Sequence, residues 1–158
     1  MRNTFNLKIF LCAALLVLMA LNSTGYARAF FGRTIRLPLQ TIAPGQGKIL
    51  IDFKLPANHE FATEAPSTVF VRTKDPQVLH TRQSQPEPLN LKALPYSLTY
   101  TAQPGTTVIA ADLRVHFCDE KSKICLSDFM RVKFPVQVKD GASDSLPLKI
   151  KLKSKQTV

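Results

Sequence analysis

Cys118 and Cys125 are the residues of this 158-residue chain whose type and spacing suggest chemistry. They flank a polar segment, 119–124, that is able to close a hairpin between two strand-like runs, 107–118 and 125–138. Opposed residues on antiparallel strands have Cβ atoms about 4.5–5.5 Å apart, slightly wider than the roughly 3.8 Å of a relaxed disulfide. A bridge across this hairpin would tend to be strained, and strained or exposed disulfides are the more easily reduced ones.

Strand alternation assigns both cysteines to the polar side of this hairpin. The positions expected in the core are Ile109, Ala111, Leu113, Val115 and Phe117 in the first run and Met130, Val132, Phe134, Val136 and Val138 in the second. The polar face then carries both cysteines together with Arg114, His116, Arg131 and Lys133. Nearby positive charge lowers the pKa of a thiol, whereas Asp119 and Glu120 act in the opposite direction.

Asp128 interrupts the alternation of the second run, because it falls among the apolar positions. We therefore expect a bulge or an irregular strand start near Ser127. Such a bulge would turn Cys125 inward and favour a buried structural bridge.

The residues alone leave two uses of the cysteine pair open. An accessible pair beside basic residues is suited to thiol–disulfide exchange. A structural bridge would instead staple the hairpin and stabilise the fold by about 2–3 kcal/mol in the chain-entropy model. The three histidines, His59, His80 and His116, show no paired spacing with the cysteines, so we expect neither a metal site nor a cofactor.

The start of the chain has the layout of a secretory signal peptide. Arg2 and Lys8 precede the uncharged run IFLCAALLVLMAL, and small residues at Ala27 and Ala29 follow it. We expect cleavage after Ala29, which would give a signal peptide over 1–29 and a single domain over 30–158. A retained membrane anchor is the alternative, but the apolar run is short for a membrane span. Export to the periplasm, an oxidising compartment, would leave Cys118 and Cys125 as the cysteines of the mature chain.

The charge of the chain does not favour nucleic acid. The formal net charge of +10 falls to 18 minus 11, or +7, without the three basic residues of the expected signal peptide. The densest basic run, Lys149 to Lys155, alternates with apolar residues as the solvent face of an edge strand does. Without tryptophan or basic–aromatic interleaving, we expect no nucleic-acid partner, and after signal cleavage no stable membrane insertion.

Short β-branched or alternating runs separated by Pro and Gly predict an all-β domain with minor helix content. The candidate strands are 34–40, 48–55, 68–73, 89–91, 96–102, 107–118, 125–138 and 146–153, and the polar stretch 80–88 is expected to be a surface loop. Seven to eight short strands in a domain of this size predict an immunoglobulin-like antiparallel β-sandwich.

Two passages resemble a known family. DFKLPANHEFATEAPSTVFV, residues 52–71, and VHFCDEKSKICLSDFMRVKFPVQV, residues 115–138, are similar to the amino-terminal domain of DsbD and to the related carboxy-terminal domain of NHL-repeat thioredoxin-like proteins. The six-residue cysteine spacing looks more like the NHL-associated version, because we expect one residue fewer in DsbD. Phe61 and Tyr96 are the candidates for the aromatic residue that caps the cysteines in DsbD.

The resemblance implies a periplasmic protein-disulfide reductase or interchange activity. Cys118 and Cys125 would be its redox pair, passing electrons between a thioredoxin-like partner and oxidised proteins. Which cysteine attacks stays open, as does the direction of electron flow. The alternative is a non-catalytic binding or assembly module in which Cys118–Cys125 is a structural disulfide.

Overall fold

Strands, turns and loops account for residues 32–154, the part of the chain that the computed structural model describes. The strands are β1 (Arg33–Arg36), β2 (Gln40–Ile42), β3 (Gly45–Lys54), β4 (His59–Phe61), β5 (Thr68–Thr73), β6 (Leu79–Thr81), β7 (Glu87–Pro88), β8 (Tyr96–Ala102), β9 (Gly105–Asp119), β10 (Cys125–Val138) and β11 (Ser145–Lys151). The expected signal peptide, residues 1–29, lies outside this part. Within 32–154, no helix has the length and apolarity to cross a membrane.

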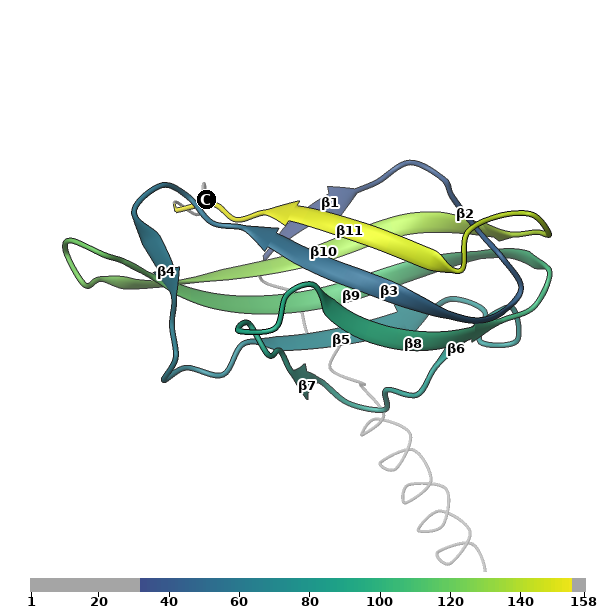
Figure 1. Ribbon diagram of the computed structural model, residues 1–158, viewed down its shortest axis with the longest axis horizontal. Helices are drawn as coiled ribbons and strands as arrows, with labels where there is room; N and C mark the ends of the chain where they lie inside the picture. Colours follow the sequence, from purple (N-terminus) through teal and green to yellow (C-terminus); the bar gives the residue numbers. More distant parts are fainter. Residues whose placement is uncertain (1–31, 155–158) are drawn as a thin grey trace, which may run out of the picture. The chain divides into compact units, whose positions relative to one another are not determined.

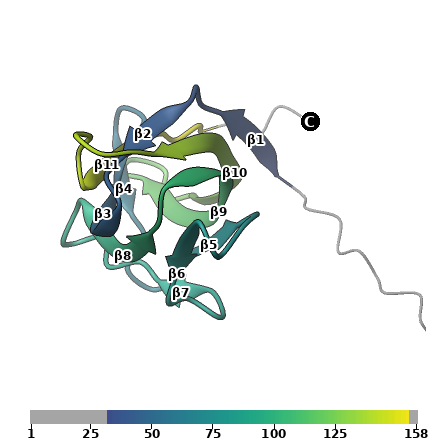
Figure 2. The same cartoon turned by 90° about the vertical axis from the view of Figure 1, so that its right-hand side faces the viewer.

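The strands form two sheets that face each other (Figures 1 and 2). A seven-stranded sheet has the order β1-β10-β9-β5-β7, with β2 also paired to β10 and β4 also paired to β9. A four-stranded sheet has the order β11-β3-β8-β6. Most neighbouring strands are antiparallel. The parallel pairs are β1 with β10, β2 with β10, and β11 with β3. The predicted all-β sandwich is therefore confirmed.

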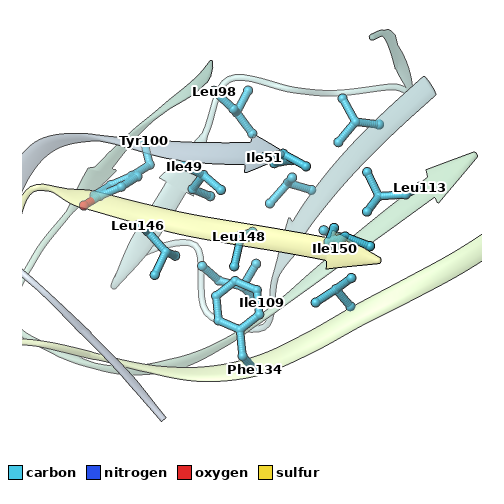
Figure 3. Close-up of a cluster of buried hydrophobic side chains, with 14 of the residues drawn as sticks. Ile49, Ile51, Leu98, Tyr100, Ile109, Leu113, Phe134, Leu146, Leu148 and Ile150 are labelled. Carbon is cyan, nitrogen blue, oxygen red and sulfur yellow. The ribbon is translucent and has the colours of Figure 1, made fainter. Parts of the chain in front are cut away.

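The core lies between the two sheets and follows the alternation of the strands. In Figure 3, Ile109, Leu113 and Phe134 of one sheet point toward Ile49, Ile51, Leu98, Leu146, Leu148 and Ile150 of the other. The ten core positions predicted for the two long runs are all buried. The inward parity of β9 and β10 is therefore confirmed, and with it the outward parity of the residues between them.

The described strands number eleven rather than seven or eight, mainly because three short strands, β4, β6 and β7, were not expected and one expected run, 34–40, is divided. Pro38 and its neighbours separate β1 from β2, which both lie along β10. The expected strand 89–91 is wrong, since those residues follow β7 as a loop and a turn. The expected surface loop 80–88 is also partly wrong, because Thr81 is buried at the end of β6 and its hydroxyl donates to the carbonyl of Val71.

Candidate functional site

Cys118 and Cys125 are directly opposite each other in the β9–β10 ladder and form a disulfide. Their Cα atoms are 3.9 Å apart. The turn between them projects past β4 at the left of Figure 1. Cys125 is exposed and Cys118 is half-buried, so the bridge is more open to a partner on the side of Cys125.

The ladder between β9 and β10 is continuous, which corrects the expected bulge near Ser127. Fourteen consecutive pairs run without interruption from Cys125 opposite Cys118 to Val138 opposite Gly105. Asp128 stays in step with the strand, faces the core and is only 3% exposed. Cys125 consequently keeps the outward orientation that strand parity predicts.

Asp128 is accommodated in the interior by Arg33. The Nε and Nη2 atoms of Arg33 donate to the two carboxylate oxygens at 3.1 and 2.8 Å, and the backbone amide of Lys153 donates at 3.2 Å. Arg33 also donates through Nη2 to the carbonyl of Lys151 at 2.7 Å. A buried carboxylate needs such charge-assisted partners, and their presence removes the reason for a bulge.

Strand β4 and the segment after it form a wall beside the disulfide. Glu60 lies opposite Cys118 on the side of β9 away from β10. The following segment is tied to β9 at His116, whose amide donates to the hydroxyl of Ser67 and whose carbonyl accepts from the amide of Ala62. Together, segment 60–65 and the outward residues of β9 and β10 enclose a groove of about 560 Å³ that reaches both cysteines.

His116 and Ser127 lie opposite each other, two pairs along the ladder from the cysteines. They therefore share the outward face with the disulfide. The imidazole Nδ1 and the hydroxyl of Ser127 are hydrogen-bonded at 2.7 Å, with the donor set by the imidazole tautomer. Burial, and secondarily the charge of Arg114, lowers the pKa of His116. The imidazole is therefore mostly neutral near pH 7 and able to accept a proton.

The turn beside the disulfide is held by Asp119. Its Oδ1 accepts from the amides of Lys121 and Ser122 and from the hydroxyl of Ser122. These hydrogen bonds, led by the Ser122 amide, lower the pKa of the Asp119 carboxyl. Lys123 adopts the left-handed backbone conformation with φ of 58° and forms an ion pair with Glu60 at 3.2 Å. The polar tip thus has a defined shape next to the exposed residue Cys125.

The two aromatic candidates for a cap have different positions. Phe61 lies in β4 opposite Phe117, packs against the core and lines the groove. Tyr96 lies in the four-stranded sheet and donates its hydroxyl to Glu87 at 3.2 Å, so it is not part of the groove. The groove wall was not identified from the sequence, because β4 has three residues and gives too short a run to show alternation.

Neither a protein-family model nor a curated protein matches the chain. Residues 32–154 contain no group of three or more His, Cys, Asp or Glu side chains placed to hold a metal ion. The groups at the groove that can take part in chemistry are the disulfide and the imidazole of His116.

Proposed function

We propose that the chain is an exported, DsbD-like thiol–disulfide exchange domain acting in the periplasm. It would pass electrons between a thioredoxin-like partner and oxidised proteins through Cys118 and Cys125. The observation that carries the proposal is the position of the disulfide, which lines a groove and joins an exposed residue, Cys125, to a half-buried one, Cys118. Accessible disulfides are the labile or catalytic kind more often than buried ones are.

The difference in exposure supports different roles for the two cysteines in the proposed exchange. The thiolate of a reduced partner attacks the sulfur of Cys125, the bond to Cys118 breaks, and Cys118 leaves as a thiolate. The second thiol of the partner loses its proton, attacks the partner's own sulfur in the mixed disulfide and releases the thiolate of Cys125. Two electrons and two protons thereby pass from the partner to the cysteine pair, and the reverse sequence delivers them to an oxidised protein.

His116 is suited to hold a proton during this exchange. It shares the outward face with Cys118 and is two residues away, about 6–7 Å along the strand. A neutral imidazole can take the proton that a thiol must lose before it attacks, and can return it to the leaving thiolate. The hydrogen bond to Ser127 and the backbone contacts of His116 keep the ring in place.

Trapping of mixed disulfides tests the proposal. The single variants Cys118→Ser and Cys125→Ser are exported, quenched with acid, alkylated and analysed by mass spectrometry. The Cys118→Ser variant, which keeps the exposed Cys125, should capture thioredoxin-fold proteins, and the Cys125→Ser variant should capture fewer. The matched control is a cysteine-free chain carrying Ser97→Cys, which places an exposed thiol on β8 of the other sheet.

Two results would contradict the proposal. One is capture of the same proteins at the same level by the Ser97→Cys control, because any exposed thiol would then suffice. The other is an absence of thioredoxin-fold proteins from all variants, which would favour a binding or assembly module with a structural disulfide.

A further inference from the structure

The outward face of the seven-stranded sheet extends well beyond the disulfide. The strand register aligns its residues in rows: Cys125, Cys118 and Glu60; Ser127 and His116; Phe129, Arg114 and Thr68; Arg131, Asp112 and Phe70; Lys133, Ala110 and Arg72. Arg36 of β1 lies beside Lys133 in the last row. The disulfide therefore occupies one end of this surface, and Lys133, Arg72 and Arg36 give the other end a positive charge.

A hollow lies at the basic end of this face, over the small side chain of Ala110. It has a volume of about 410 Å³ and is lined by four cationic side chains, those of Arg72, Lys74, Arg131 and Lys133. Val108, an exposed apolar residue, also lines it. Ala110 has a smaller side chain than the residues around it, so the cationic side chains form the rim of a recess.

Asp112 organises two of these cations without neutralising the group. Its carboxylate forms ion pairs with both Arg72 and Arg131. The hydrogen bond from Arg131 to Asp112 raises the pKa of Arg131, which keeps the guanidinium charged. Four cations and one carboxylate leave a net charge of +3 at the hollow. Guanidinium groups held in this way are pre-organised to bind further carboxylate oxygens.

Aromatic rings under arginine side chains occupy the middle of the face. The guanidinium of Arg114 lies 4.5 Å from the ring centroid of Phe129, and that of Arg72 lies 5.5 Å from the ring centroid of Phe70. Both rings are half-buried although they belong to the outward side of the sheet. Arginine and aromatic residues are the types enriched at protein–protein interfaces. This combination favours a protein surface over a lipid headgroup or a nucleic acid, which would need phosphate contacts mainly.

We propose that this face, which we call the basic face (Arg36, Phe70, Arg72, Lys74, Arg114, Phe129, Arg131 and Lys133), docks an acidic segment of a partner protein. Asp or Glu carboxylates of that segment enter the hollow over Ala110, and its apolar side chains cover Phe70, Phe129 and Val108. Opposite charge at such a surface accelerates encounter and fixes the orientation of the partner. The proposal does not depend on the exchange activity, because binding is measured with the disulfide intact.

Charge reversal on the two sheets tests the basic face. The double variant Lys74→Glu/Lys133→Glu changes two exposed lysines at the hollow. The matched control, Lys149→Glu/Lys151→Glu, makes the same change of charge on exposed lysines of β11 in the other sheet. The probe is a short fluorescein-labelled peptide of Glu, Asp and Leu, titrated by fluorescence anisotropy at two salt concentrations. Phosphatidylglycerol vesicles and a single-stranded oligonucleotide serve as competitors.

The proposal predicts that the hollow variant binds the peptide at least about tenfold more weakly than the parent, while the β11 control stays within about twofold. Binding by the parent should weaken as salt is raised. Equal weakening in both variants would reduce the effect to net charge and overturn the proposal. Absence of peptide binding by the parent would overturn it as well. Stronger, hollow-dependent binding of vesicles or oligonucleotide than of peptide would replace the acidic protein with a phosphate-bearing ligand. If the reversal variant does not fold, Lys74→Gln/Lys133→Gln takes its place.

Discussion

Arg33→Ala should destabilise the fold more than Asp128→Leu at its partner does, because the two charges differ in their access to water. Asp128 is 3% exposed and Arg33 is 26% exposed. Removing Arg33 leaves the buried carboxylate with the hydrogen bond from the backbone amide of Lys153. Removing the carboxylate instead leaves a cation that can turn toward solvent.

The magnitude follows from the burial of the pair. Breaking a fully buried ion pair by removing one partner costs about 3–5 kcal/mol. The partial exposure of Arg33 lets water reach the carboxylate, so we expect Arg33→Ala to lower the free energy of unfolding by about 2–4 kcal/mol. Asp128→Leu should cost less than Arg33→Ala, and the double variant Arg33→Met/Asp128→Leu should be close to neutral, since apolar residues of similar size often replace buried pairs without loss.

Urea unfolding of the parent, the two single variants and the double variant measures these differences. The comparison holds when the slope of the unfolding free energy against urea concentration is the same in all four proteins. The same variants should retain the Cys118–Cys125 disulfide and its accessibility, because Asp128 faces the core and the cysteines face outward. A cost below about 1 kcal/mol for Arg33→Ala, or a larger cost for Asp128→Leu than for Arg33→Ala, would refute the reasoning.

Three further predictions concern the groove, a close backbone contact and the bridge. His116→Gln should flatten the pH dependence of stability between about pH 7.5 and 5. Folding lowers the pKa of His116, so the unfolded state binds more protons than the folded state does. The parent protein therefore loses stability as pH falls through about 6.5, whereas the variant lacks this contribution. Urea unfolding at the two pH values checks this, and an equal slope in both proteins would contradict it. Gly47→Ala should lower the free energy of unfolding by at least about 2 kcal/mol, because a Cβ there would lie 2.3 Å from the carbonyl oxygen of Asp144. A loss under about 0.5 kcal/mol in thermal unfolding would contradict this close contact. Replacing Cys118 and Cys125 with Ala should cost at most about 2–3 kcal/mol in urea unfolding, given the short loop with a sequence separation of 7; a larger loss would indicate a staple that the fold requires.

The orientation of the cysteines could be predicted from the sequence because it depends on local alternation. The buried positions of β9 and β10 repeat every second residue, so the facing of Cys118 followed directly. Asp128 violated that pattern, and the sequence-based expectation of a bulge was wrong because its partner, Arg33, is 95 residues away. Interactions between such distant residues leave no periodic signal in a single chain.

The wall of the groove could not be predicted for a related reason. Strand β4 contains three residues and follows a Pro-containing turn, which is too short a run for alternation to identify. Its position is fixed by pairing with the end of β9, through Glu60 opposite Cys118 and Phe61 opposite Phe117. The basic residues of the outward face were assigned correctly by parity, but the hollow over Ala110 depends on the register of β5, β9 and β10 together.

The reduction potential of the Cys118–Cys125 pair tests the proposed exchange function most directly. The oxidised protein is equilibrated with thiol–disulfide buffers of graded potential, quenched by alkylation, and the fraction reduced is read by mass spectrometry. An exchange pair should titrate above about −300 mV and should be reduced by a thioredoxin-like donor. A pair that stays oxidised below about −300 mV and resists that donor would be a structural disulfide and would contradict the proposed function.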